Sequence, residues 1–472
     1  MTVLDEASGA GLAIAGVAEK GRRARARHLR RVDSIARSEP RLLSPEQTQV
    51  VLLSFEGPDQ YSGAGGLAVR VNGLAESLMQ AGYPVHLFFV GDPDRPGVET
   101  AAGGVVLHRW CQAISRHASG GVYAEEERKV EDLCVWLPDH LAGLIEAGRD
   151  AGLVTVVLAE EWHMAWPLIA LSDLLRARGL RHHALLAWNA NNRFGFERLD
   201  FARLADAAAL LTVSKAMKHV MWGWGVNPMV VPNGLPDNWL APPPEEAGRA
   251  LRSGFGEDLL LAKVGRWHPD KRWRMALDVV AALHRSGRSA VLIARGWAGD
   301  PAAGSHYREL RDHAAGLGLD WAVCLQPGPA DHELIRPEWP ANESAPAVVE
   351  LAFPTPVAQL RVLYRGADVV IANSGFEPFG LVGLEAMAAG GVVVTGSFGE
   401  DYVSVRNGFS LDTDFAAEVL QCLDWLRDDP DREAAMRASA IDTASHYRWT
   451  LVLDRLLRAL ELDAERQLHP SI

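Results

Sequence analysis

Short apolar runs, each followed by a longer segment of mixed apolar and polar residues, recur along most of the chain. The expected strands form a first group at 50–54, 84–90, 154–158, 184–187, 210–213 and 229–231, and a second group at 259–264, 367–373 and 392–394. Because these runs are almost entirely apolar, the strands are expected to be covered on both faces, as in parallel sheets. Strands that alternate with helices in this way predict α/β domains.

Proline and glycine mark where the chain passes between the two groups of strands. Pro232-Asn233-Gly234-Leu235-Pro236 runs into Pro242-Pro243-Pro244, a density typical of a hinge or crossing segment. Residues 326–356 are also rich in proline and are expected to be an insertion or a lengthened loop. The predicted parts are an extension over 1–48, a first domain over 49–235, a second domain over 236–445 and a closing helical segment over 446–472.

Composition narrows the classes of function. A chain of 472 residues has room for two domains, and a net charge of −13 argues against a general nucleic-acid binder. The four cysteines lie far apart, without metal-ligand spacing, which indicates thiols in a reducing compartment. No stretch approaches the length of a membrane span, and the apolar run 9–17 is too short, so a cytoplasmic protein is expected.

The stretch over residues 20–41 is strongly basic against this acidic background. One interpretation is an arm that makes weak contact with an anionic surface. The other is a solvated segment that packs on the protein's own acidic surface, which the lack of bulky apolar residues favours.

The most informative stretch is Phe376-Glu377-Pro378-Phe379-Gly380-Leu381, which follows the buried run 367–373 and leads into an apolar helix. Glu377 is therefore expected in a loop at the carboxyl end of a strand, and Glu385 one to two turns into the helix. The first amides of that helix have no partner within it, and the helix dipole favours an anion there. The sequence thus predicts a phosphate site with a carboxylate on either side, which suits sugar hydroxyls.

With this strand before it and this helix after it, the stretch resembles the Glu-x7-Glu motif of retaining glycosyltransferases that use nucleotide sugars and have the GT-B fold. Glycogen and starch synthases and glycosyltransferase family 4 carry versions of the motif. The resemblance covers residues 50–460. It implies two Rossmann-like parallel-sheet domains with a cleft between them, and a C-terminal helix that crosses back to the first domain. The first domain would hold the acceptor and the second the nucleotide sugar.

A basic cluster, Val264-Gly265-Arg266-Trp267-His268-Pro269-Asp270-Lys271-Arg272, follows the first strand of the second domain. Ligands of open α/β sheets bind beyond the carboxyl ends of the strands, so Arg266 and Lys271 are placed where a phosphate would lie. The cluster is similar to the Gly-Arg-x4-Lys segment of GT-B glycosyltransferases. The resemblance implies that both cations bind the diphosphate and stabilise it as it leaves.

Loops of the first domain resemble those of the glycogen synthases more weakly. Gly63-Ala64-Gly65-Gly66-Leu67 is similar to their Gly-Gly-Leu loop, in which the backbone approaches the donor, although the Lys that precedes their paired glycines is missing. Glu160-Glu161-Trp162-His163 looks like their Asp-Trp-His segment and implies that His163 contacts the donor sugar. A lone histidine after a strand is also often a structural hydrogen-bonding group.

Two further loops add weaker support. In Trp188-Asn189, which stands where the synthases have His-Asn, Asn189 would keep a polar contact and Trp188 would change the wall of the cleft. The segment 395–400 resembles the loop that lines the acceptor and nucleotide side in the same enzymes.

The resemblance as a whole implies transfer of a hexose, with glucose from UDP or ADP as the expected donor, to a saccharide or glucan acceptor. No metal and no other cofactor is expected. The expected catalytic residues are Arg266, Lys271, Glu377 and His163, with Glu377 holding sugar hydroxyls or polarising the acceptor. The expected donor-binding residues, with Glu385 on the ribose, are Gly65, Gly66, Asn189, Phe379, Gly380, Leu381 and Glu385.

Other interpretations stay open. An epimerase of the same fold would need an acid/base pair that the sequence does not clearly offer, and a pyridoxal-phosphate-dependent phosphorylase would need a lysine beyond Lys271, where none occurs. A non-catalytic protein that binds carbohydrate or nucleotide sugar would have no reason to keep both cations and both glutamates. A transferase with a lipid-linked or other small-molecule acceptor rests only on the basic stretch.

Overall fold

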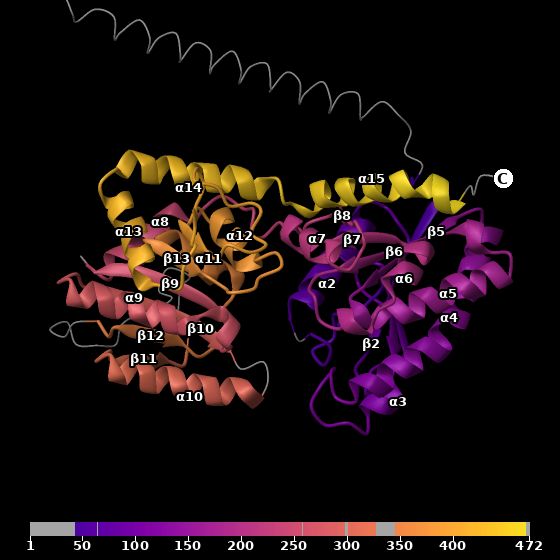
Figure 1. Cartoon of the computed structure of the whole chain (residues 1–472), viewed down its shortest axis with the longest axis horizontal. Coiled ribbons are helices and arrows are strands. Elements are labelled where there is room, and N and C mark those ends of the chain that lie inside the picture. Colours follow the sequence, from indigo (N-terminus) through magenta and orange to yellow (C-terminus); the bar gives the residue numbers. More distant parts are fainter. Residues whose placement is uncertain (1–42, 64, 257, 298–300, 327–344, 469–472) are drawn as a thin grey trace, which may run out of the picture.

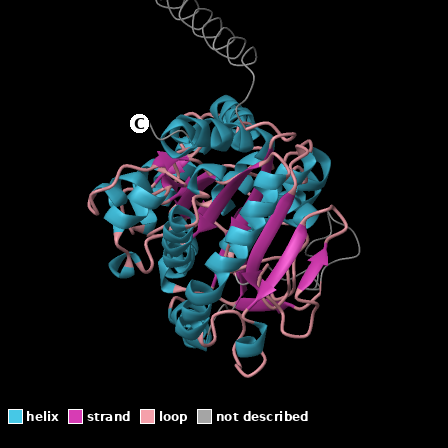
Figure 2. Ribbon diagram, turned by 90° about the vertical axis from the view of Figure 1, so that its right-hand side faces the viewer, coloured by secondary structure: helices cyan, strands magenta, loops and turns pink. Residues whose placement is uncertain are grey.

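The computed structural model describes residues 43–63, 65–256, 258–297, 301–326 and 345–468, which form two bodies that stand side by side (Figure 1). The basic stretch over 20–41, the apolar run 9–17 and most of the proline-rich stretch lie outside the described residues. Each body is built on one sheet. In Figure 2, where the first body faces the viewer, helices lie against its sheet.

The first sheet has the strand order β3-β4-β2-β1-β5-β6-β7-β8. All of its neighbours pair in parallel except β3, which runs antiparallel to β4 at the edge. Its strands are β1 Thr48–Leu53, β2 Val85–Val90, β3 Val98–Thr100, β4 Val106–Trp110, β5 Val154–Glu160, β6 Ala184–Ala190, β7 Ala209–Thr212 and β8 Met229–Val230. The central strands were expected from their apolar runs, and β3 and β4 were not.

The second sheet is parallel throughout, in the order β11-β12-β10-β9-β13-β14-β15. Its strands are β9 Leu259–Arg266, β10 Ala290–Trp297, β11 Trp321–Cys324, β12 Val348–Leu351, β13 Val369–Ala372, β14 Val393–Thr395 and β15 Phe409–Ser410. The expectation of a loop or insertion over 326–356 was wrong at its end, because β12 lies inside the sheet between β10 and β11. Its four buried residues are too short a run to stand out among the prolines.

The helices fill the connections between strands. Those of the first body are α2 Gly66–Gln80, α3 Gln112–Ser115, α4 Glu126–Asp150, α5 Ala165–Ala177, α6 Phe201–Ala207 and α7 Lys215–Trp222. Those that follow are α8 Glu245–Ser253, α9 Trp273–Arg285, α10 Pro301–Gly316, α11 Val357–Gly366, α12 Leu381–Ala388, α13 Ala416–Arg427, α14 Pro430–Ser445 and α15 Trp449–Leu468. Among the described residues, no helix is long and apolar enough to cross a membrane.

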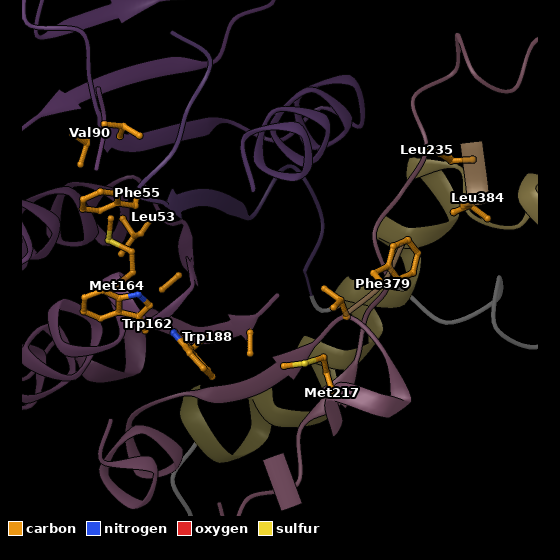
Figure 3. Packing of buried hydrophobic residues seen from close by; sticks show 14 of the residues in the cluster. Leu53, Phe55, Val90, Trp162, Met164, Trp188, Met217, Leu235, Phe379 and Leu384 are labelled. Carbon is orange, nitrogen blue, oxygen red and sulfur yellow. The ribbon is translucent and has the colours of Figure 1, made fainter. Parts of the chain in front are cut away.

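Apolar side chains of both bodies meet in one buried cluster, since residues of both sheets belong to it. Figure 3 shows part of this packing, with Trp162 and Trp188 from the first body and Phe379 and Leu384 from the second. Trp188 is fully buried, so the expectation that it changes the wall of a cleft was wrong. Its indole Nε1 donates a 2.8 Å hydrogen bond to the backbone carbonyl of Glu161, which fixes the ring inside the core.

The chain crosses between the bodies twice, and the two crossings touch. Leu235, in the first, forms an isolated parallel bridge with Arg448, in the second. After this bridge α15 lies along the first body (Figure 1) and packs on α2 and β6. Near its end, the Gln467 side-chain amide donates to the carbonyl of Leu186 and accepts from its N–H, both at 2.9 Å. The last helix therefore completes the first body.

Candidate functional site

The loops that follow the strands of the two sheets contact one another. Arg193, in the loop after β6, places its guanidinium carbon 4.4 Å from the ring centroid of Phe376, in the loop after β13. The backbone N–H of Lys215, at the start of α7, donates to Asp401, in the loop after β14, at 2.5 Å. Since ligands of such sheets bind beyond the carboxyl ends of the strands, the candidate site lies between these two sets of loops.

An ion pair stands at the centre of the second body's loops. Lys271, in the short 3-10 turn after β9, donates through Nζ to Oε2 of Glu377, after β13, and both side chains are partly exposed. The two loops are joined by the Gly375 N–H, which donates to the Asp270 carbonyl at 2.7 Å. The sequence therefore located these two residues correctly at one edge of the sheet, but the pairing neutralises both charges.

The other expected cation, Arg266, is exposed at the end of β9, and its side chain has no ion pair within the described part of the chain. The Arg266 carbonyl accepts a 2.7 Å hydrogen bond from the indole of Trp273, which fixes the backbone at this turn. Arg272 follows with a left-handed backbone, φ 48°, and pairs with Asp414 at 2.8 Å. Of these cations, only Arg266 is available to an anion without breaking an existing ion pair.

Helix α12 begins beside the ion pair, as the sequence predicted. Gly380 precedes it with φ 79°, a conformation that favours glycine, and its carbonyl accepts a hydrogen bond from the Tyr402 hydroxyl. Leu381 is half-buried at the first helical position. Phe379 lies inside the apolar cluster, 5.8 Å from the Tyr402 ring between centroids, so it anchors the loop and does not line the site.

Glu385, the second carboxylate of the motif, is half-buried on α12. Burial raises the pKa of its carboxyl to about 7. Burial, and then the nearby Glu385, raise the pKa of the Tyr364 phenol, whereas Arg295 at the end of β10 lowers it. Tyr364 is fully buried, so only Glu385 and Arg295, which are partly exposed, are open to a ligand here.

Lys263, a residue that the sequence analysis missed, lies beneath this region on β9 and is only 2% exposed. Its Nζ donates to the carbonyl of Ile371 at 3.3 Å and to the side-chain oxygen of Asn373. Burial, and then the nearby Lys271 and Arg272, lower the pKa of this amine well below its usual value. The sequence signal was a lone lysine within an otherwise apolar strand.

Glu400 was not among the expected site residues, although the segment 395–400 resembles a loop that lines the site in related enzymes. It follows β14 and is 8% exposed, and neither carboxyl oxygen has a hydrogen-bond partner among the described residues. Burial, and then the nearby Glu377, raise the pKa of this carboxyl well above its usual value. An acid placed after a buried strand was the only sequence signal.

In the first body, the start of α2 is already occupied by a carboxylate of the protein. Glu56, in the loop after β1, accepts through Oε2 from the N–H groups of Gly65 and Ala68, at 2.9 and 3.0 Å. Its Oε1 accepts from the Tyr123 hydroxyl at 2.5 Å. Gly66 opens the helix and is exposed, with open space where a Cβ would stand. The glycine loop keeps its predicted position, but its first amides are used internally.

His163 is buried rather than displayed at the site, with 4% of its surface exposed. Its ring stacks between those of Phe55 and Trp162, at 4.1 and 4.2 Å between centroids. Its Nε2 lies 2.7 Å from a carboxylate oxygen of Glu126, and burial lowers the pKa of the imidazole. In this arrangement the histidine acts as a packed hydrogen-bonding group.

Asn189 belongs to a buried polar network at the end of β6. Its amide donates to Glu160 at 2.8 Å, and Asn191 donates to the same oxygen at 2.7 Å. Arg70 of α2 lies on the other side of Glu160, with Nε 3.1 Å from both carboxylate oxygens, and its NH1 donates to Asn233 of the crossing segment at 2.6 Å. The network therefore links the glycine-loop helix, the strand ends and the hinge.

Taken together, the second body offers helix amides without a partner among the described residues, a lysine, an exposed arginine and two glutamates at one edge of its sheet. This set can bind a phosphate group and hydroxyl groups side by side. Within the described part of the chain, no three or more His, Cys, Asp or Glu side chains are grouped so that they could hold a metal ion.

Comparison with known proteins shows that the chain is similar to glycosyltransferases in its sequence and in its fold. The family described as "Glycosyl transferases group 1" matches residues 341–442. A D-inositol 3-phosphate glycosyltransferase from Catenulispora acidiphila is 37% identical over 416 residues, which are 84% of this chain and 90% of that protein.

Among solved structures, HepE of Anabaena in complex with UDP and glucose has a TM-score of 0.58 at 17% identity, over 87% of this chain and 99% of its own. The catalytic domain of starch synthase IV from Arabidopsis thaliana, bound to ADP and acarbose, has a TM-score of 0.63 at 16% identity, over 89% of this chain and 100% of its own. At such low identity the structures establish the arrangement of the two bodies and nothing finer.

Proposed function

Because this chain belongs to the group 1 glycosyl transferases and has their GT-B fold, we propose that it transfers a hexose from a nucleotide sugar with retention of the anomeric configuration. The observation that carries the proposal is the juxtaposition of Lys271 and Glu377 at the start of α12. A diphosphate bound to the first amides of α12 would compete with Glu377 for Lys271. Glu377 would then be released to accept hydrogen bonds from sugar hydroxyls.

The proposed reaction breaks the bond between the anomeric carbon and the diphosphate oxygen. The new bond forms between that carbon and an acceptor oxygen on the same face, and the acceptor proton passes to the leaving phosphate. Positive charge develops on the sugar, and the diphosphate gains negative charge as it leaves. Lys271, Arg266 and the α12 amides would stabilise that negative charge, and the proposed mechanism uses no metal.

The proposed donor is a UDP- or ADP-hexose, with glucose as the expected sugar. Both nucleotides occur in complexes of proteins with the same fold, HepE and starch synthase IV. The partly exposed Glu385 on α12 would bind the ribose hydroxyls of the nucleoside. His163 would support the first body's wall from behind rather than contact the sugar.

For the acceptor, the charge at the strand ends of the first body favours an uncharged hydroxyl compound, a saccharide or another small polyol. The relative from Catenulispora is named for an acceptor that carries a phosphate. In this chain several cations near those strand ends are engaged: Arg70 pairs with Glu160, and Arg109 pairs with Asp59 at 2.7 Å, whereas the exposed Arg193 packs on Phe376. Lys129 is fully buried against the Val122 carbonyl. An uncharged acceptor needs none of them.

The test is nucleotide release from UDP- and ADP-hexoses in EDTA, by the wild type and by Glu377→Ala. Each donor is offered with myo-inositol, inositol 3-phosphate, glucose or a maltooligosaccharide. We expect release from one donor with an uncharged acceptor, and at least about a hundredfold less from the variant. Preference for inositol 3-phosphate would contradict the acceptor proposal, and dependence on added metal would contradict the proposed mechanism. No release with any pair, together with no binding of UDP or ADP, would contradict the function itself.

A further inference from the structure

The loop after β14 is held tightly against the loop that carries Glu377. A Cβ placed on Gly399, whose φ is 87°, would stand 1.9 Å from the Glu377 carbonyl oxygen. A Cβ placed on Gly396 would stand 2.2 Å from the Ser374 carbonyl oxygen. Only glycine allows the two backbones to approach this closely. Glu400 is therefore carried on a fixed backbone and not on a loose surface loop.

The Glu400 carboxyl group is turned toward the start of α12. A Cβ placed on Gly380, which precedes that helix, would stand 2.7 Å from Cγ of Glu400 and 3.2 Å from its Oε1. The Tyr402 hydroxyl, from the same loop as Glu400, bonds to the Gly380 carbonyl. Glu400 is thus the carboxyl group closest to the turn that opens the proposed anion site.

The same carboxyl group has no hydrogen-bond partner among the described residues. Both of its oxygens are buried, and neither receives a hydrogen bond from any described residue. An ionised carboxylate in such a position would carry a large desolvation cost, so the geometry favours the uncharged acid. Among the surrounding groups, Glu377 and Asp401 oppose ionisation, whereas the backbone amide of Glu400 itself and Lys271 favour it, and Lys271 is already paired with Glu377.

We propose that Glu400 is a further donor-binding residue, whose uncharged carboxyl group donates a hydrogen bond to an oxygen of the diphosphate bound at the start of α12. This inference rests on the proposed function and deepens it at one residue. Phosphate oxygens only accept hydrogen bonds, and an uncharged carboxyl group can donate one, whereas an ionised carboxylate would repel the phosphate. Ligand binding would thereby satisfy a group that the protein alone leaves unsatisfied.

A purely structural role explains the residue less well. A buried acid without partners costs folding free energy, and an apolar side chain of similar size would fill the same space without that cost. The two roles therefore predict opposite effects for Glu400→Met. A structural residue would lose stability when it is replaced, whereas a ligand-binding residue would lose affinity for the diphosphate and keep or gain stability.

The experiment measures UDP and ADP binding by calorimetry, uridine and adenosine binding by competition, and thermal unfolding. The proteins are the wild type, Glu400→Met, Glu400→Gln and the control Glu246→Met, which replaces an exposed acid on α8. We expect Glu400→Met to weaken binding of the diphosphate about tenfold or more, the loss expected for one hydrogen bond to a charged group. Nucleoside binding and the melting temperature should not fall. Glu400→Gln keeps an N–H donor and should stay within about threefold of the wild type.

Three results would overturn the role of Glu400, and a fourth would overturn the proposed function. Unchanged diphosphate binding by Glu400→Met would overturn the inference and leave the proposed function intact. Equal losses for diphosphate and nucleoside, together with a lower melting temperature, would overturn it in favour of a structural role. A Glu400→Gln variant as weak as Glu400→Met would overturn it as well, because the amide can still donate. If the wild type itself binds neither UDP nor ADP, the proposed function fails first, and Glu400 is not the reason.

Discussion

Arg193 of the first body and Phe376 of the second lie face to face, with the guanidinium carbon 4.4 Å from the ring centroid. Phe376 immediately precedes Glu377 in the chain, and its ring stacks on that of Phe398, 4.4 Å away between centroids, in the loop that carries Glu400. Arg193 of the first body therefore packs on Phe376, whose ring stacks on Phe398. The loops that carry these two rings also carry Glu377 and Glu400. The contact ties the proposed acceptor side to the proposed donor side.

Arg193→Ala should impair catalysis without unfolding the protein. Cation–π contacts at exposed positions contribute about 0.5–1 kcal/mol, so kcat/KM is expected to fall roughly two- to fivefold. The melting temperature should stay within about one degree, because exposed contacts of this size scarcely affect global stability. Steady-state kinetics with the accepted donor and thermal unfolding test this. A fall in melting temperature that matched the loss of activity would show that the contact supports the fold alone.

Glu377→Gln should separate binding from turnover. The change removes the partner of Lys271, so the lysine becomes free for phosphate, and UDP or ADP affinity should rise about threefold, the upper range for a partly exposed ion pair. Transfer should fall at least about a hundredfold, because the amide no longer offers a charged acceptor to the sugar hydroxyls. Calorimetry and nucleotide release measure the two effects. The exposed Glu246→Gln is the control, and weaker nucleotide binding by Glu377→Gln would contradict the proposed competition.

Glu385 should make the protein less stable as pH rises. Burial raises the pKa of its carboxyl to about 7 in the folded state, from 4.5. The folded protein therefore binds more protons than the unfolded one between these values, and this contribution to stability is lost as pH rises through 7. Glu385→Gln should melt a few degrees higher than the wild type at pH 8 and close to it at pH 5. Equal melting temperatures at pH 8 would show that the carboxyl is not destabilised by burial.

His108 should make the protein less stable as pH falls below about 6.5. It stacks on Phe88 with 4.0 Å between ring centroids, and burial, followed by His86 and His140, lowers the pKa of its imidazole from 6.5 to about 4. The unfolded chain binds the proton more readily, so stability is complete above about pH 6.5 and is lost as pH falls toward 4, by up to about 3 kcal/mol.

The measurement for this histidine is the free energy of unfolding by urea at several pH values. His108→Phe, which keeps a ring on Phe88, should show a shallower loss of stability between pH 6.5 and 4 than the wild type. The exposed His117→Gln should leave the slope unchanged. Parallel slopes for the wild type and His108→Phe would rule out this histidine as the source.

Gly73→Ala should reverse the usual effect of such a change in a helix. Alanine in place of glycine normally stabilises a helix interior by about 0.5–1 kcal/mol. Here a Cβ would stand 2.3 Å from the indole Nε1 of Trp449, so the substitution should destabilise by about 1–3 kcal/mol. The control is Gly143→Ala in α4, where no atom lies within 4 Å of the new Cβ, and this variant should be stabilised. Chemical unfolding of both proteins gives the two signs.

The combination Gly73→Ala with Trp449→Phe adds a second check on the same contact. The smaller ring should relieve the clash, so the double variant should be less destabilised than the sum of the two single changes. Additive losses would show that the indole does not limit the space at this position.

The elements at the carboxyl ends of the long buried strands could be predicted from the sequence, because chain order and strand direction alone bring them together. Glu377 and Lys271 are 106 residues apart in the chain, yet both follow strands of one parallel sheet. Their direct pairing could not be foreseen, since it depends on side-chain positions that no periodicity encodes. The strand β12 was missed because three apolar residues and a glutamate between prolines carry too little pattern.

Other misses have the same origin. His163 was placed correctly after β5, but its burial depends on the rings of Phe55 and Trp162, which come from two different loops. Glu56 follows a phenylalanine after β1, just as Glu377 follows Phe376 after β13, and this parallel was the available signal for an acid at a helix start. The sequence does not show that Glu56 accepts from backbone amides while Glu377 accepts from a lysine, because this difference depends on packing between distant segments.

The return of α15 to the first body also has a consequence for how the protein is made. The core beneath the first sheet contains residues from Leu43 to Val231, and its remaining members, among them Trp449, Leu453, Leu456 and Leu460, come from the last helix. A ribosome synthesises the whole second body before it reaches those residues. The first half of a nascent chain therefore emerges with part of its apolar face uncovered, and it can close that face only after the final helix has left the exit tunnel. The first body is therefore synthesised first but completed last.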